Sequence, residues 1–133
     1  MADQTQNKRV MCIEDDPGII DLVKMILIRR GYQVAGATSG PEGLKLLETE
    51  KPDIVLLDLM MPGMDGWEVY HQMQANEATK TIPVIIITAK AQNIDKVLAL
   101  HIAKVDDYLT KPFTPQELID SIEKVLARNS QSK

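Results

Sequence analysis

The sequence predicts an α/β fold, a doubly wound parallel sheet of five strands with helices on both faces. Strand-like and helix-like segments alternate five times along the chain, which is typical of parallel strands joined by helical crossovers. The third and fourth strands are continuous apolar runs, as expected for strands that are covered on both faces. The predicted strands cover residues 9–13, 32–35, 53–57, 83–87 and 106–109.

Four of the predicted helices begin at a capping residue. Asp16 precedes a proline at the first helical position, where the missing N–H costs nothing, and Gly31 is placed to end that helix. The other three begin with a capping box, in which Ser, Asp or Thr is followed three residues later by Glu. These boxes are Ser39 with Glu42, Asp65 with Glu68, and Thr114 with Glu117. One more helix is expected between residues 93 and 103, without a clear cap.

Length and composition indicate one globular domain. The chain has 133 residues, of which 44% are hydrophobic and 26% charged, a balance that suits a single core. We expect this domain over residues 8–128, with disordered ends at 1–7 and 129–133. The formal net charge is -4 and no basic stripe is present, which argues against direct nucleic-acid binding.

Cysteine content and hydropathy predict a cytoplasmic protein. The single cysteine, Cys12, lies in an apolar run and is expected to be buried and inert. No apolar stretch approaches the ~18 residues that a membrane span requires. Residues 1–7 are polar and lack the hydrophobic segment of a signal peptide.

Charged residues follow three of the predicted strands. Asp58 ends the apolar run 54–57, Glu14 and Asp15 follow the first strand, and Lys111 follows the last. A charge is costly in the middle of so apolar a strand, so Asp58 is expected to emerge where its strand stops. The carboxyl ends of parallel strands meet at one edge of the sheet, where ligands bind. The sequence therefore predicts a metal-and-phosphate site at this edge.

The chemistry of these residue types supports that prediction. Two carboxylates ~4 Å apart repel by roughly 4 kcal/mol at an effective dielectric near 20, and a divalent cation relieves the repulsion. Oxygen ligands favour Mg²⁺, which keeps positions open for phosphate. A carboxylate can also attack a phosphoryl group to give an aspartyl phosphate. Phosphoryl transfer then needs mainly positioning and neutralisation of charge.

Several motifs in fixed order resemble the receiver domain of two-component response regulators. The resemblance extends from about Arg9 to Arg128 and implies a flavodoxin-like sheet with strand order 2-1-3-4-5. The motifs are Glu14-Asp15, Asp58 followed by the turn-rich residues 60–66, Thr88-Ala89, and Tyr108-Leu109-Thr110-Lys111-Pro112-Phe113.

The resemblance implies a role for each residue of the predicted site. Asp58 would accept the phosphoryl group. Glu14 and Asp15 would hold Mg²⁺ together with Asp58, Asp15 being the more direct ligand, and Met60 would add its backbone carbonyl. Lys111 would pair with the phosphoryl oxygens.

The resemblance also implies a switch. Thr88, which Ala89 follows, would bond the phosphoryl group through its hydroxyl, and Tyr108 would swing inward as Thr88 moves. The peptide bond between Lys111 and Pro112 would be cis. These changes would alter the face formed by the fourth helix, the fifth strand and the fifth helix.

The implied partners are a histidine kinase or histidine phosphotransfer protein and an unknown downstream protein, with neither nucleic acid nor membrane bound directly. In family members that dimerise through the face of the fourth helix, fifth strand and fifth helix, basic residues of the fifth helix join a charge network. Here the fifth helix has no basic residue before Lys124, so we expect a monomer or weak dimer. The resemblance also implies that the chain catalyses its own phosphorylation and dephosphorylation, and that the residues two positions after Asp58 and Thr88, here Met60 and Lys90, tune the attack of water on the phosphoryl group. Dephosphorylation is expected to be slow, because neither side chain can accept a hydrogen bond well enough to orient that water.

Two other functions are compatible with a carboxylate that accepts a phosphoryl group or with a receiver fold. A Mg²⁺-dependent aspartyl-phosphate phosphatase of the haloacid-dehalogenase kind would need an acid two residues after Asp58, where this chain has Met60. A degenerate receiver acting only as a scaffold would not need Asp58, Thr88 and Lys111 together. The chain departs from the usual receiver pattern at Glu14, where Asp is commoner, at Lys104-Val105, where Gly-Ala is usual, and by one extra residue between Thr88 and Tyr108.

Overall fold

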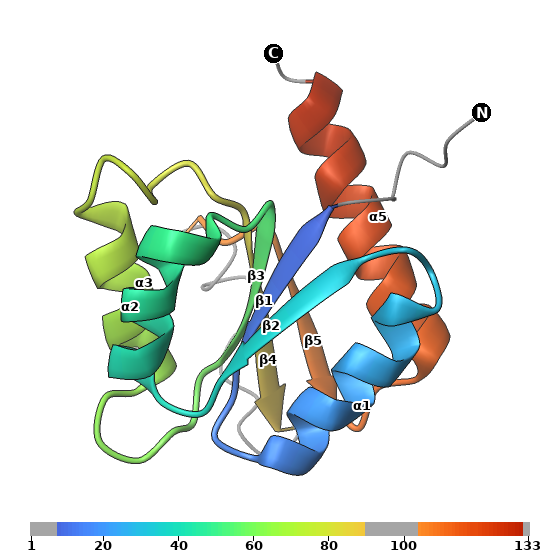
Figure 1. Cartoon of the computed structure of the whole chain (residues 1–133), viewed down its shortest axis with the longest axis horizontal. Helices are drawn as coiled ribbons and strands as arrows, with labels where there is room; N and C mark the ends of the chain where they lie inside the picture. The colour runs from blue at the N-terminus through green and yellow to red at the C-terminus, as the bar shows by residue number, and fades with distance from the viewer. Residues whose placement is uncertain (1–7, 90–103, 132–133) are drawn as a thin grey trace.

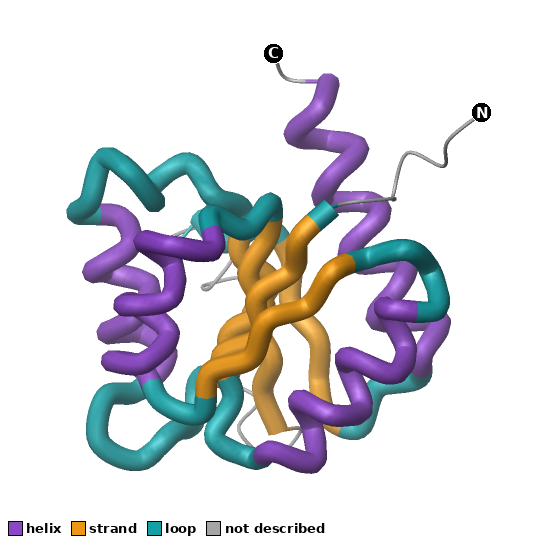
Figure 2. Tube along the Cα trace, in the orientation of Figure 1, coloured by secondary structure: helices purple, strands orange, loops and turns teal. Residues whose placement is uncertain are grey.

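A computed structural model describes residues 8–89 and 104–131 and confirms the α/β fold (Figure 1). Strands and helices alternate from Arg9 to Ala89, and a further helix follows the strand at Asp107–Lys111 (Figure 2). The helix predicted at 93–103 and the disordered end predicted at 1–7 lie outside the described residues. The strands are β1 (Arg9–Ile13), β2 (Gln33–Ala37), β3 (Ile54–Asp58), β4 (Val84–Ala89) and β5 (Asp107–Lys111). The helices are α1 (Pro17–Ile28), α2 (Gly40–Glu50), α3 (Gly66–Gln74) and α5 (Pro115–Gln131).

The strands form one parallel sheet in the predicted order, β2-β1-β3-β4-β5. Strands β3, β4 and β5 each continue beyond their predicted carboxyl ends, because ladder pairing extends into the polar residues that follow the apolar runs. Asp58 is paired with Ile87 and Ala89 with Lys111. The candidate phosphoacceptor is therefore the last residue of its strand rather than the first residue after it.

Helices cover both faces of the sheet, as predicted. In Figure 1, α1 and α5 lie on one side of the strands and α2 and α3 on the other. Alternate strand residues divide between the two cores because successive side chains point to opposite faces. Leu56 and Ile85 belong to the core beneath α1 and α5, whereas Leu57 and Ile86 belong to the core beneath α2 and α3.

Cys12 is fully buried in the first of these cores. Burial, with a smaller contribution from the charge of Glu14, raises the pKa of its thiol to about 12. The reactive thiolate is therefore suppressed at neutral pH, as expected for an inert cysteine.

The predicted helix caps are present. Asp16 accepts a hydrogen bond from the Gly18 N–H at 2.8 Å, and Asp65 accepts one from the Glu68 N–H at 3.0 Å. The third capping box is reciprocal: Thr114 Oγ1 accepts from the Glu117 N–H, while Glu117 accepts from the Thr114 N–H. In the box at Ser39, Ser39 Oγ accepts a hydrogen bond from the Glu42 N–H, but the Glu42 carboxylate accepts from the N–H of Thr38, the residue before the cap, instead of from Ser39. All four helix starts are thus encoded locally.

Helix ends were harder to predict. Gly31 ends α1 as expected: it has φ +92°, and the N–H groups of Gly31 and Tyr32 donate to the carbonyls of Ile28 and Leu27. Helix α5, in contrast, continues to Gln131, three residues beyond the predicted boundary at 128. None of the helices in the described ranges is long and apolar enough to cross a membrane.

Two lysines adopt a left-handed backbone that favours glycine. Lys104, one of the departures from the receiver pattern, has φ +63°, which explains why glycine is usual there. Lys51 has φ +46° and ψ +63° at the end of α2, where its N–H donates to the Leu47 carbonyl. A side chain in this conformation costs about 1–2 kcal/mol.

We predict that Lys51→Gly raises the free energy of unfolding by about 0.5–1 kcal/mol, because relief of the left-handed strain exceeds the added chain entropy. Urea denaturation measures the change. Lys45→Gly is the matched control: this exposed lysine lies inside α2, so the same replacement should lower stability by about 1 kcal/mol. Equal destabilisation by both substitutions would contradict the assignment of strain to Lys51.

Candidate functional site

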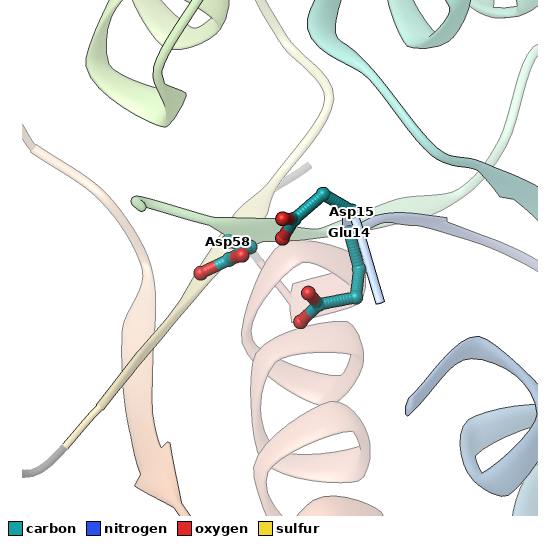
Figure 3. A group of neighbouring side chains, drawn as sticks. All are labelled: Glu14, Asp15 and Asp58. Atoms are coloured by element: carbon teal, nitrogen blue, oxygen red, sulfur yellow. The ribbon is translucent and has the colours of Figure 1, made fainter. Parts of the chain in front are cut away.

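Three strand ends bring the predicted acidic residues together. Glu14 and Asp15 follow β1, and Asp58 ends the neighbouring β3. One carboxylate oxygen from each of the three lies within 4.8 Å of the others. Figure 3 shows the three side chains grouped at this edge, with the carboxylate of Glu14 below that of Asp15. The sequence prediction of an acidic cluster at this edge is confirmed.

Asp58 is more deeply buried than the sequence suggested. Asp58 is only 2% exposed, whereas the sequence predicted that it emerges from the sheet where its strand stops. The Met60 N–H donates to Asp58 Oδ1 at 3.2 Å, and Lys111 Nζ lies 3.7 Å from the same oxygen. These two groups compensate part of the cost of burying a carboxylate.

Lys111 pairs more closely with Glu14 than with Asp58. Its Nζ lies 2.6 Å from Glu14 Oε1, and the Glu14 side chain is completely buried. The other carboxylate oxygen of Glu14 accepts a hydrogen bond from the Asp16 N–H at 3.1 Å. Glutamate is one methylene longer than aspartate, so it reaches the lysine from the end of β1. Glu14 is thereby held by partners on both oxygens.

Burial and like charge perturb the titration of the site. Burial, followed by the negative charge of Glu14, raises the pKa of Asp58 from 3.8 to about 7, although Lys111 and the Met60 N–H act in the opposite direction. Burial acts to lower the pKa of Lys111, but its hydrogen bond and ion pair with Glu14 outweigh this and raise it. Lys111 is therefore cationic at neutral pH, whereas Asp58 is partly protonated when no metal is bound.

The donor set fits a hard divalent cation. All three side chains offer carboxylate oxygens, the ligands that Mg²⁺ prefers. Asp15 is exposed, and Lys111 Nζ lies 3.7 Å from Asp58 but only 2.6 Å from Glu14, so Asp58 is the less tightly paired of the two. Asp15 and Asp58 are therefore the better placed direct ligands, and Glu14 is better placed to contribute its charge. The resemblance likewise implied Asp15 as the more direct ligand, which stays a prediction.

The other predicted residues lie on the two strands beyond β3. Thr88 is 3% exposed near the end of β4 and pairs with Thr110 of β5. Ala89 pairs with Lys111, whose peptide bond to Pro112 is cis, as the resemblance implied. Tyr108 lies earlier in β5, opposite Ile86, where it packs half-buried against the core beneath α2 and α3. The fold thus brings Thr88 and Lys111 to the same edge as Asp58.

Gly66 supports the site, although the sequence interpretation placed it only in a turn and in the capping box that begins at Asp65. Its N–H donates to the Leu59 carbonyl at 3.0 Å. A methyl group added at Gly66 would overlap the Asp58 carbonyl oxygen and lie 2.7 Å from Leu59 Cα. The absence of a side chain therefore lets the start of α3 lie against the backbone of the phosphoacceptor. The glycine after Asp65 is visible in the sequence, but its close approach to the backbone of Asp58 and Leu59 could not be predicted from it.

Comparisons with known proteins point to one family. The family described as the response regulator receiver domain matches residues 10–123. The alkaline phosphatase synthesis transcriptional regulatory protein PhoP of Bacillus subtilis (strain 168) is 41% identical over 123 residues, 92% of this chain and 50% of that protein. The DNA-binding response regulator MtrA of Mycolicibacterium smegmatis (strain ATCC 700084 / mc(2)155) is 35% identical over 125 residues, 94% of this chain and 53% of that protein. The chain spans about half the length of these two relatives.

Solved structures show the same fold. The receiver domain of the Francisella response regulator 1452 superposes with a TM-score of 0.81 and is 32% identical. The match covers 92% of this chain and 98% of that one.

We predict that Asp58→Asn stabilises the metal-free protein at about pH 8 by roughly 2–4 kcal/mol. The folded state binds the Asp58 proton more tightly than the unfolded chain does. The stabilisation that this proton gives to the wild-type fold is therefore fully present below about pH 4 and is lost as the pH rises through about 7. Asparagine imitates the protonated form, and the advantage over wild type should shrink at about pH 5. Urea denaturation of both proteins, with a chelator present, measures the difference in the free energy of unfolding at each pH. A difference that does not depend on pH would contradict the raised pKa of Asp58.

Proposed function

Because the chain belongs to the response regulator receiver domain family, we propose that Asp58 accepts a phosphoryl group from a phosphohistidine. The observation that carries this proposal is the buried Asp58 carboxylate, which lies among two further carboxylates and one lysine at the carboxyl edge of the sheet. In the transfer, an oxygen of Asp58 attacks phosphorus, a P–O bond forms, the P–N bond breaks, and the imidazole leaves as the second product.

The side chains around Asp58 supply what this transfer needs. Lys111 is cationic and close enough to pair with a phosphoryl oxygen once the Asp58 carboxylate has become an acyl phosphate. Thr88 offers a hydroxyl donor from the adjacent strand. Bound Mg²⁺, held by Asp15 and Asp58 with Glu14 and the Met60 carbonyl nearby, would neutralise charge on the acidic cluster and on the incoming phosphoryl group.

The phosphodonor in this proposal is a histidine kinase or a histidine phosphotransfer protein. The receiver then signals to a downstream protein through the face that contains β5 and α5; the fourth helix of that face lies outside the residues described. The names of both relatives denote regulators of transcription or DNA binding, so the output of a protein with this receiver would be of that kind. The net charge of -4 argues that the receiver itself does not bind DNA.

The charges on β5 and α5 support a monomer. Asp107 accepts a hydrogen bond from Ser121 Oγ at 2.6 Å and pairs with Lys124 Nζ at 3.1 Å, both on α5 of the same chain. The Arg128 guanidinium likewise donates to the Asp106 carbonyl. These charged groups therefore already have intramolecular partners and need no second copy of the chain.

Phosphorylation at Asp58 can be tested with phosphoramidate, a small P–N phosphodonor, in the presence of Mg²⁺. Intact-mass measurement should show one added phosphoryl group on wild type and none on Asp58→Asn, which lacks the nucleophilic oxygen. Asp120→Asn is the control, since Asp120 is exposed on α5, away from the site. Undiminished labelling of Asp58→Asn would overturn the assignment.

For the oligomeric state, we predict that the domain remains monomeric in light scattering with and without Mg²⁺ and beryllofluoride, an analogue of the phosphoryl group. The reason is that Asp107 is already paired with Ser121 and Lys124. A dimer that forms with beryllofluoride and is abolished by Lys124→Ala would show instead that this helix forms intermolecular salt bridges.

A further inference from the structure

Two methionines of the described chain stand out by their exposure. The sequence contains seven methionines. Met25 on α1 is 58% exposed and Met60 is 51% exposed, whereas Met11, Met61 and Met73 are at most 7% exposed. A dissolved oxidant can therefore reach the thioethers of Met25 and Met60 far more easily than those of the buried three.

The backbone holds Met60 beside the phosphoacceptor. Its N–H donates to Asp58 Oδ1 at 3.2 Å, and its neighbours in the chain, Leu59 and Met61, are 6% and 7% exposed. Two buried side chains flank it, so the segment cannot easily rotate to bury Met60 instead. The exposed thioether is thus a fixed feature of the loop that binds the Asp58 carboxylate. Met25 is exposed to a similar extent on α1 but does not lie next to Asp58 in the chain.

Oxidation would change the chemistry of this position. A peroxide transfers one oxygen atom to the sulfur: the S–O bond forms, the O–O bond breaks, the thioether loses two electrons, and hydrogen peroxide is reduced to water. The product, methionine sulfoxide, is polar where the thioether was apolar. Its oxygen is a good hydrogen-bond acceptor, whereas a thioether sulfur is a weak one.

We propose that Met60 is a site of oxidation by peroxide, and that its sulfoxide shortens the lifetime of the phosphoryl group on Asp58. The inference rests on the proposed function. Loss of the phosphoryl group requires a water molecule to attack phosphorus, and the thioether gives that water no strong acceptor. The sulfoxide oxygen supplies an acceptor that orients the water. Peroxide then shortens the signal without altering Asp58, Lys111 or Thr88.

The first measurement locates the oxidation. Wild type is treated with dilute hydrogen peroxide, and the gain of one oxygen atom at each methionine is followed in proteolytic peptides by mass spectrometry. Met60 and Met25 should be oxidised well before Met11, Met61 and Met73. Oxidation of Met60 no faster than of these buried residues would overturn the proposal.

The second measurement follows the phosphoryl group. Oxidised and untreated proteins are labelled with phosphoramidate and Mg²⁺, the donor is removed, and the remaining aspartyl phosphate is followed by intact mass. Oxidised wild type should lose its label at least about threefold faster than untreated wild type. The same acceleration should occur in Met25→Leu, which retains Met60. In Met60→Leu, treated and untreated samples should decay alike.

A polar substitution gives an independent check without oxidant. Met60→Gln places an amide oxygen at a similar distance from the backbone, so untreated Met60→Gln should decay faster than untreated Met60→Leu. If Met60→Leu is accelerated by peroxide as much as wild type, or Met60→Gln is no faster than Met60→Leu, the regulatory role of Met60 is wrong. If untreated wild type accepts no phosphoryl group, both the proposed function and this regulatory role of Met60 are wrong. The oxidation measurement then still decides whether Met60 is a site of oxidation.

Discussion

The site depends on two carboxylates buried around a single lysine. Glu14 is fully buried and Asp58 is 2% exposed, and among the residues that the structure describes Lys111 is the cation paired with both. Burial, followed by the negative charge of Glu14, raises the pKa of Asp58 to about 7, and Lys111, which lies closer to Glu14, offsets this only in part. Burial of like charges is costly unless they are paired. The apo site therefore holds a repulsion that a divalent cation bound to Asp15 and Asp58 would relieve.

The rest of the sheet edge serves to hold these charges in place. Parallel pairing brings the ends of β1, β3 and β5 to the same edge, although they are far apart in the sequence. Met60 donates its N–H to the Asp58 carboxylate, and Gly66 brings the start of α3 against the Asp58 backbone. A bulkier residue at Gly66 would have to move this loop. The position of the phosphoacceptor is thus determined by backbone contacts as much as by its own side chain.

Strand β5 connects the site with the surface of the domain. Its last residue, Lys111, pairs with Glu14 and Asp58, and its first, Asp107, is held by Ser121 and Lys124 of α5. Tyr108 lies between these two anchors. A change in the charge around Asp58 acts directly on Lys111, and hence on a short strand that is attached to α5 at its other end. The proposed switch through β5 and α5 would act along this connection.

The sequence by itself determined the fold class, the strand order, the helix starts and the acidic cluster. Each depends on a local pattern: apolar runs that end in carboxylates, capping residues, and ordered motifs resembling a receiver domain. Only the tertiary structure decided how closely Lys111 pairs with each of the two buried carboxylates. No spacing in the sequence reveals that Glu14 and not Asp58 is the closer partner of Lys111, since that depends on distances between side chains of β1, β3 and β5. The burial of Asp58 and the contact at Gly66 likewise arise only when segments distant in the chain pack together, because exposure and close approach are properties of the assembled sheet.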